Sequence, residues 1–265
     1  PALITSIMLS LSYKEMIYLD YNQSFNIQRT RGLTKGFYIT IAFVLLINSS
    51  DLLFQVINQT RQLMSFSFAI YGAICFFRKK WIKTLLFFII ATFTHHSAPL
   101  VIVCIISSYY LKDVKIWFLI LILTTLLSIS GISKPLLSAA GLTIDSDSVY
   151  YQALNSNTVL YIKSAITCLL GFIAYMLSRK ALVKGTIYGF FLNIYVSICA
   201  LAMLFVVYGE ASNRIQRYAG VLFPVLFSMS LNKIRISEWL IILILLISMT
   251  YMLFLMSYDA TLVTI

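Results

Sequence analysis

Long apolar runs separated by short polar and basic stretches follow one another along the whole chain. Crossing a bilayer as an α-helix takes roughly 17–25 apolar residues, and several of these runs approach or exceed that length. The alternation of apolar and polar residues that marks the strands of a membrane β-barrel is absent. Lipid offers no hydrogen-bond partners to backbone N–H and C=O groups, so helices are expected. The runs lie at about 2–19, 37–57, 62–77, 84–111, 116–130, 158–177, 186–208, 218–232 and 238–257.

This pattern predicts an all-α polytopic integral membrane protein with about 8–10 membrane helices. We expect one membrane domain over residues 1–265, with an extracytoplasmic polar loop at 131–157 and no appended soluble domain. The first run is interrupted by Lys14 and Glu15 and is therefore poorly defined. Composition agrees, since 60% of the residues are hydrophobic and 11% are charged, with a mean hydropathy of +0.91. A soluble domain carries roughly 25% charged residues.

The run at 84–111 is broken in its middle by the sequence HHSAP at 95–99. Pro99 removes a backbone donor and disfavours helix at the residue before it. The two limbs, 84–94 and 99–111, would each be about 17–20 Å long at 1.5 Å per residue. We therefore expect a re-entrant hairpin, or two short helices buried in protein, with both histidines at the tip.

The distribution of charge supports this break. Arg78–Lys83 and Arg179–Lys184 are both strongly basic, and the positive-inside rule places both in the cytoplasm. An even number of membrane crossings must then separate these two basic segments. A hairpin over 84–111 gives an even number, whereas a single helix over 84–111 does not. The hairpin also places Lys112 and Lys115 on the cytoplasmic side.

The net charge of +11 does not indicate a nucleic-acid partner, because the basic residues form short clusters between apolar runs, as in membrane proteins. Of the 20 basic residues, Lys14 has no assigned side. Five face outward, against the charge rule: Arg61, Lys134, Lys163, Arg214 and Arg217. Charged residues at unusual positions of a membrane protein commonly mark function. The four cysteines lie inside apolar runs without paired spacing, which favours core packing over disulfides or metal ligation.

Four polar features meet on the predicted outer side. They are Arg61-Gln62 at the head of a helix, the two histidines of the hairpin tip, Asp145 in the loop 131–157, and Glu210 followed by Arg214, Arg217 and Tyr218 at the start of a later helix. Guanidinium groups bind phosphate oxygens through paired hydrogen bonds and stay charged, and helix N-termini favour anions. The arginines therefore predict a phosphate or diphosphate clamp. The alternative is that they are interfacial anchors whose side chains reach water.

A histidine whose pKa lies near neutrality, beside arginines, suits general-base chemistry. The alternative is a buried imidazole hydrogen-bonded to a backbone carbonyl. Adjacent residues on a helix point about 100° apart, so His95 and His96 form a poor metal-binding pair and no metal is expected.

The pair Arg61-Gln62, followed one helix later by ATFTHHSA at 91–98, resembles the EpsG/Wzy family of polysaccharide polymerases. That family carries an Arg-Gln pair opening a membrane helix, then an A-x-x-x-H-x-S-A stretch. It also carries a later Arg-x-x-x-Tyr, which Arg214 and Tyr218 match here. On this alignment His95 is the family histidine, and the next residue occupies a variable position.

The resemblance covers roughly residues 36–257. Pro99 stands where the family usually has an aliphatic residue. The N-terminus is shorter than is usual in the family, so leading helices are expected to be missing or divergent.

The resemblance implies polymerisation, outside a bacterial inner membrane, of oligosaccharide repeat units carried on undecaprenyl diphosphate. The growing chain is transferred from its lipid diphosphate to the next lipid-linked unit. A GT-C-like glycosyltransferase architecture is compatible with this activity. The expected partners are the undecaprenyl-diphosphate-linked oligosaccharide, membrane lipid and a chain-length regulator protein, and no cofactor is expected.

In such a reaction Arg61 and Arg214 would stabilise the charge that develops on the diphosphate, and His95 would accept the proton of the attacking hydroxyl. The substrate-binding candidates are Gln62, Arg217, Tyr218, Glu210 and Asp145. Two other functions stay open. A transporter or flippase of lipid-linked oligosaccharide needs the same arginines but no proton acceptor, although the chain shows no internal repeat. A membrane sugar O-acyltransferase also uses a histidine as base.

Overall fold

The computed structural model describes residues 2–25, 35–47, 60–139, 141, 157–178 and 185–231. Within these ranges the regular structure is entirely helical, so the all-α prediction is confirmed for this part of the chain. The elements are α1 (Ala2–Phe25), α2 (Lys35–Ile47), α4 (Thr60–Phe77), α5 (Trp81–Thr94), α6 (Ala98–Tyr110), α7 (Val114–Ile129), α8 (Ser133–Ala139), α10 (Asn157–Ser178), α11 (Ile187–Leu204), the 3-10 helix η2 (Val206–Tyr208) and α12 (Gly209–Leu231).

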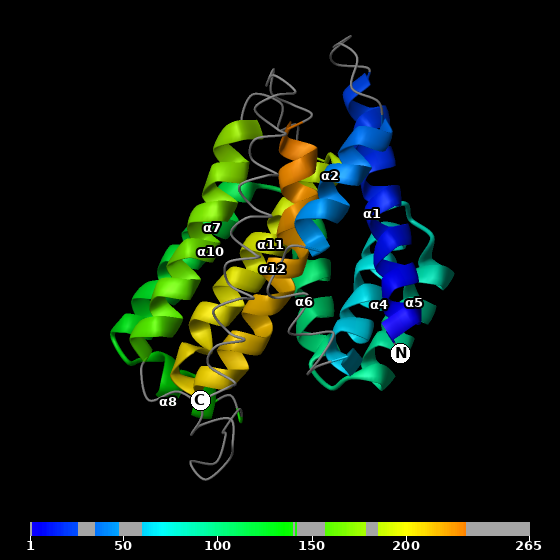
Figure 1. Ribbon diagram of the computed structural model, residues 1–265. Helices are drawn as coiled ribbons and strands as arrows, with labels where there is room; N and C mark the ends of the chain where they lie inside the picture. Colours follow the sequence, from blue (N-terminus) through cyan, green and yellow to red (C-terminus); the bar gives the residue numbers. More distant parts are fainter. Residues whose placement is uncertain are drawn as a thin grey trace, which may run out of the picture.

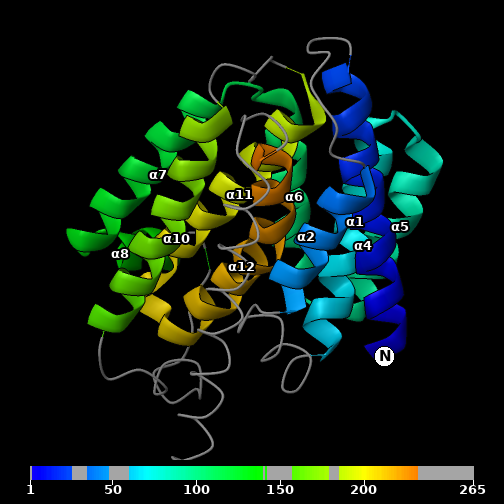
Figure 2. The same ribbon diagram turned by 45° about the horizontal axis from the view of Figure 1, so that its top comes forward.

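The helices form one bundle with α11 and α12 in its middle (Figure 1). Helices α7 and α10 lie at one edge and α1, α4 and α5 at the other, an arrangement that the view turned by 45° repeats (Figure 2). The middle position of α11 follows from its sequence, because it is apolar all round and 89% buried. Its buried tyrosines donate to backbone carbonyls of α10, Tyr188 to Ala174 at 2.8 Å and Tyr195 to Thr167 at 2.7 Å.

Helix α11 is the one helix of the described residues that is both long and apolar enough to cross a membrane by itself. The pair α7–α8, bent by 100°, would be a second. Among the described residues, the spans judged by length and composition are therefore fewer than the 8–10 predicted for the whole chain. The surface nevertheless carries large exposed apolar side chains, as on α5 (Ile82 87%, Phe93 88%) and α7 (Leu119 66%). Soluble monomers rarely expose broad apolar surfaces, so these outward faces are suited to lipid.

The predicted break in the run 84–111 is confirmed. Helix α5 ends at Thr94 and α6 begins at Ala98. Pro99 lies in the first turn of α6, where a helix needs no backbone donor. With 14 and 13 residues, the two helices are about 21 and 20 Å long, less than the roughly 30 Å of a bilayer core.

The bundle has two chemically different ends. At the histidine end, which holds Gln62, His95, Ser97 and Tyr218, the start of α4 and the turn 95–97 meet α12. At the lysine end, which holds Lys79, Lys112 and Lys115, the ends of α4 and α6 meet the starts of α7 and α11. These three lysines share one end of the bundle, as the charge pattern predicts.

Three element boundaries differ from the predicted ones. Helix α1 continues through Lys14 and Glu15 to Phe25, because Glu15 has a partner, the Arg78 guanidinium, at 2.8 Å. The loop 131–157 begins with a short helix, α8. The rest of that loop, with Asp145, lies outside the described residues, as does the run at 238–257.

Helix α12 begins at Gly209, nine residues before the predicted 218. Polar side chains of this early part have partners in the bundle. Ser212 Oγ donates to the Ala202 carbonyl at 2.7 Å, and Gln216 Nε2 donates to Thr167 Oγ1 at 2.9 Å. Arg214 and Arg217, predicted at the start of this helix, therefore lie in its second and third turns.

Candidate active site at the histidine end

Gln62 joins the first turn of α4 to α12. Its side chain is 1% exposed, and its Nε2 donates to the Arg214 carbonyl at 3.1 Å. One turn further along α4, the Phe66 ring stacks on Tyr218 with centroids 4.7 Å apart. Positions four apart share a helix face, so residues 62 and 66 of α4 contact residues 214 and 218 of α12.

The turn between α5 and α6 adds a chain of hydrogen bonds to this contact. His95 Nδ1 lies 2.7 Å from Ser97 Oγ, and Ser97 Oγ lies 2.5 Å from the Tyr218 hydroxyl. Gln62 also hydrogen-bonds the Tyr218 hydroxyl through its side chain. Three segments far apart in the sequence thus meet through His95, Ser97, Tyr218 and Gln62.

The hydrogen bonds of Ser97 fix the orientation of the imidazole. The Ser97 backbone N–H lies 3.2 Å from the same Nδ1 that its hydroxyl contacts. Because the backbone N–H can only donate, Nδ1 accepts from it and carries the lone pair, so the neutral ring has its proton on Nε2. His95 is therefore a proton acceptor at Nδ1, beside the Ser97 hydroxyl.

Burial lowers the pKa of His95, in the turn, to about 4, with further lowering from His96 and from the Arg214 guanidinium. Both effects disfavour the imidazolium form. The imidazole is consequently neutral at physiological pH, which is the form that can accept a proton. The sequence had suggested a pKa near neutrality, so the protein environment shifts this group further than expected.

His96 occupies a different environment from its neighbour. It is exposed, whereas His95 is half-buried. The two rings stack with centroids 4.3 Å apart, so His96 covers one face of the His95 ring without contacting Ser97 or Tyr218 by any hydrogen bond in the described structure.

The other predicted site residues fall into three groups. Arg214 is half-buried beside the cluster, and Arg217, one turn on, is 6% exposed. Arg61 is exposed and makes no hydrogen bond or ion pair within the described part of the chain. Asp145 and the side chain of Glu210 lie outside what the structure describes.

Ser97 is a site residue that the sequence reading did not select. It is the only residue of the described structure that hydrogen-bonds both His95 and Tyr218. Its position in the A-x-x-x-H-x-S-A stretch was a usable signal, because that pattern keeps a hydroxyl two residues after the histidine. Phe66, which supports the Tyr218 ring, carried no such signal.

The pairing of the Arg-Gln helix with the histidine turn and the Arg-x-x-x-Tyr helix agrees with the comparison against known families. A model described as the EpsG family matches residues 3–262. The chain belongs to the EpsG family. Its membership indicates a polymerase-type role in polysaccharide biosynthesis, with glycosyltransferase-like activity on a lipid-linked oligosaccharide. No curated protein and no solved structure matches the chain.

EpsG membership also bears on the location of the chain. Together with the apolar helices and their exposed apolar faces, it indicates a membrane protein. All the residues of the histidine end lie inside the matched region of the family.

Proposed function

We propose that the protein polymerises lipid-linked oligosaccharide repeat units at the outer face of a bacterial inner membrane. It transfers the growing glycan from undecaprenyl diphosphate to the next lipid-linked unit. The observation that carries this proposal is the hydrogen-bonded cluster in which Ser97 and Tyr218 hold a neutral His95 beside the Arg214 guanidinium. A proton acceptor and a phosphate-binding cation then lie at one end of the bundle.

The reaction needs one bond to form and one to break. The hydroxyl of the acceptor's non-reducing sugar attacks the anomeric carbon of the donor, and the bond from that carbon to the diphosphate oxygen breaks. The hydroxyl proton passes to the His95 imidazole, with Nδ1 as the accepting nitrogen. The leaving diphosphate gains negative charge, which Arg214 and the exposed Arg61 stabilise electrostatically.

The remaining predicted residues have supporting roles in this proposal. Tyr218 orients the turn 95–97, and Gln62 orients the backbone of Arg214. Arg217 adds positive charge to α12, the helix that carries Arg214. Glu210 and Asp145 stay candidates for sugar binding on sequence grounds. The outward location rests on the charge rule, because Lys79, Lys112 and Lys115 lie at the opposite end of the bundle.

Lipid-linked sugars in a deletion strain provide the first test. Loss of a polymerase leaves single repeat units on the lipid, exposed on the outer face. If the units were instead trapped inside, the protein would be a flippase. If chain length stayed normal while acylation was lost, it would be an acyltransferase.

A second test uses the purified full chain with a synthetic undecaprenyl-diphosphate-linked repeat unit. Products longer than one unit, formed without any nucleotide sugar, are expected. Absence of such products from folded protein supplied with its own strain's repeat unit would contradict the proposal.

A further inference from the structure

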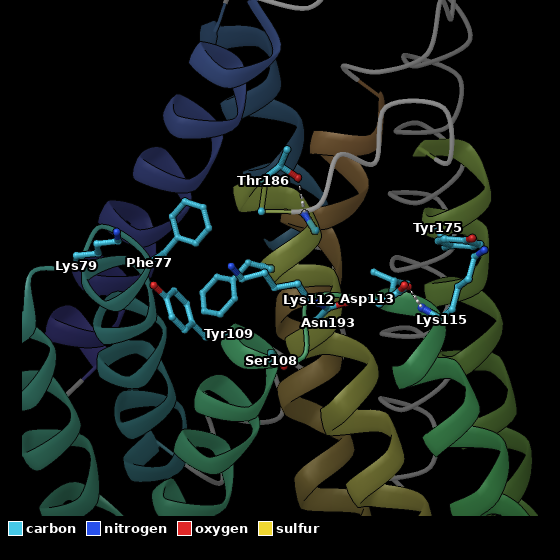
Figure 3. Close-up of a pocket in the computed structure, with 14 residues that line it drawn as sticks. Phe77, Lys79, Ser108, Tyr109, Lys112, Asp113, Lys115, Tyr175, Thr186 and Asn193 are labelled. Carbon is cyan, nitrogen blue, oxygen red and sulfur yellow. Dashed lines mark hydrogen bonds between the residues drawn. The ribbon is translucent and has the colours of Figure 1, made fainter.

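A cavity of about 520 Å³ opens at the lysine end, opposite the proposed active site. Ligand pockets are commonly 300–1,000 Å³, so the space is large enough for a small polar molecule. Aromatic side chains form part of its wall, with Phe77 stacked on Phe190 at 5.4 Å and Tyr109 edge-on to Phe190 at 6.2 Å. Figure 3 shows the Tyr109 ring beside the Lys112 side chain.

The charge around the cavity is unbalanced. Lys79, Lys112 and Lys115 line it together with one carboxylate, Asp113. Asp113 accepts from the Lys115 backbone N–H at 3.0 Å, as the N-cap of α7. Lys112 lies 5.9 Å from the Tyr109 ring centroid. The cavity therefore favours an anion.

Asn193 gives a second and independent indication of a ligand. Its side chain lines the cavity and is 1% exposed. The Nδ2 group donates to the Leu111 carbonyl at 3.2 Å, which fixes the amide orientation, and the Oδ1 atom has no hydrogen-bond partner in the part of the chain that the structure describes. A buried, unpaired acceptor is unfavourable by roughly 1–3 kcal/mol. A ligand that donates a hydroxyl here would satisfy it.

We infer that this cavity binds a phosphorylated polyol, with its phosphate on Lys112 and a hydroxyl on Asn193. The aromatic walls suit the carbon skeleton of such a molecule. Phosphate chemistry fits Lys112 as a point charge, which needs no planar fork. The same chemistry is present in a phosphatidylglycerol headgroup and in a soluble sugar or glycerol phosphate.

The experiment compares these two sources on the purified full chain. One arm measures binding of glycerol 1-phosphate and inorganic phosphate by calorimetry in phosphatidylcholine nanodiscs. The other arm counts phosphatidylglycerol adducts by native mass spectrometry against a phosphatidylcholine background. Binding in the lipid arm alone assigns the site to a headgroup, and binding in the soluble arm assigns it to a free polyol phosphate.

Matched variants locate the binding. Lys112→Gln should weaken it at least about tenfold, because a charged hydrogen-bond partner is lost. Lys83→Gln, an exposed lysine of α5 outside the cavity, should leave it unchanged. Asn193→Leu should weaken glycerol 1-phosphate binding but not inorganic phosphate binding, with the unfolding temperature as a check on folding.

Two results would overturn the inference. One is no binding above background in either arm. The other is an equal effect of Lys83→Gln and Lys112→Gln, which would mean that diffuse surface charge is responsible. Neither result bears on polymerisation, since the active site lies at the other end of α4, about 27 Å away at 1.5 Å per residue.

Discussion

The histidine end and the lysine end of this bundle are built from some of the same helices but in opposite ways. At the histidine end, polar side chains form hydrogen bonds with one another, as in the chain of hydrogen bonds from His95 through Ser97 to Tyr218. At the lysine end, Lys79 and Lys112 are exposed around an open cavity. One end therefore holds groups in fixed orientations, and the other offers charge without fixing it.

This difference separates two tasks, the positioning of a proton acceptor and the attraction of an anion. Proton transfer requires an acceptor at a defined distance and angle, which a satisfied hydrogen-bond network provides. Attraction of an anion requires only an excess of positive charge. Substitutions at the two ends should act independently, because distant sites without shared partners are usually additive.

The largest effect is expected from the histidine that the network holds. His95→Ala should reduce polymer formation by about 10²-fold or more, the usual range for a lost general base. His96→Ala is the matched control, since His96 is exposed and lacks the Ser97 contact, and it should cost little. The measurement is the initial rate with equal amounts of folded protein. A dead His96→Ala would show that the motif alignment is off by one residue. Full activity in both variants would make Glu210 the next residue to test.

The arginines test whether geometry or charge alone matters at the histidine end. Arg214→Lys and Arg61→Lys should each lose most activity, about tenfold or more, because lysine keeps the charge but lacks the two-pronged donor. Arg78→Lys makes the same change at the other end of α4, where Arg78 pairs with Glu15, and should leave activity unchanged. Wild-type rates in both Arg61→Lys and Arg214→Lys would identify these arginines as membrane anchors.

A smaller effect is expected from loss of the Tyr218 hydroxyl, which contacts the turn 95–97 through Ser97. Tyr218→Phe removes the hydrogen bonds to Ser97 and Gln62 but keeps the ring stacked on Phe66. A typical hydrogen bond contributes about 1 kcal/mol net, so a rate loss of roughly fivefold is expected. Tyr110→Phe, on an exposed tyrosine near the lysine end, serves as the control. Equal rates for both variants would mean that the cluster does not orient His95.

The pH dependence should be weak across the physiological range. With its pKa lowered to about 4, His95 stays neutral and able to accept a proton from pH 8 to pH 6. The rate should fall only below about pH 5, as protonation removes the acceptor. A pH–rate profile measures this directly. A decline centred near pH 6.5, the value of an unperturbed histidine, would show that substrate or lipid alters this environment.

The arrangement of the two ends can be tested without any change in activity. Cysteines placed at Lys83 and Lys112 should both react with an impermeant label only from the cytoplasmic side, because the hairpin of α5 and α6 returns the chain to its starting side. Reaction of the Lys112 position from outside would overturn the topology.

The sequence by itself determined the helical class, the break in the run 84–111 and the grouping of the lysines at one end. Each of these properties depends either on neighbouring residues in the sequence or on a sum over many residues. Helices follow from apolar runs that cannot leave backbone groups unpaired, the break follows from Pro99, and the grouping of the lysines follows from the pattern of charges along the chain. The resemblance to the EpsG family likewise came from short motifs, and it is confirmed.

Tertiary structure alone decided which groups meet. Ser97 and Tyr218 are 121 residues apart, and Gln62 and Arg214 are 152 apart. No local pattern predicts such pairs, because they depend on how α4, α12 and the turn 95–97 pack. Packing also extended α12 back to Gly209, since Ser212 and Gln216 find partners only in the folded bundle. Asn193 shows the reverse case, where one amide atom is paired and the other has no partner among the described residues. Whether a buried polar atom is satisfied is a property of the packed structure, so the sequence could not reveal it.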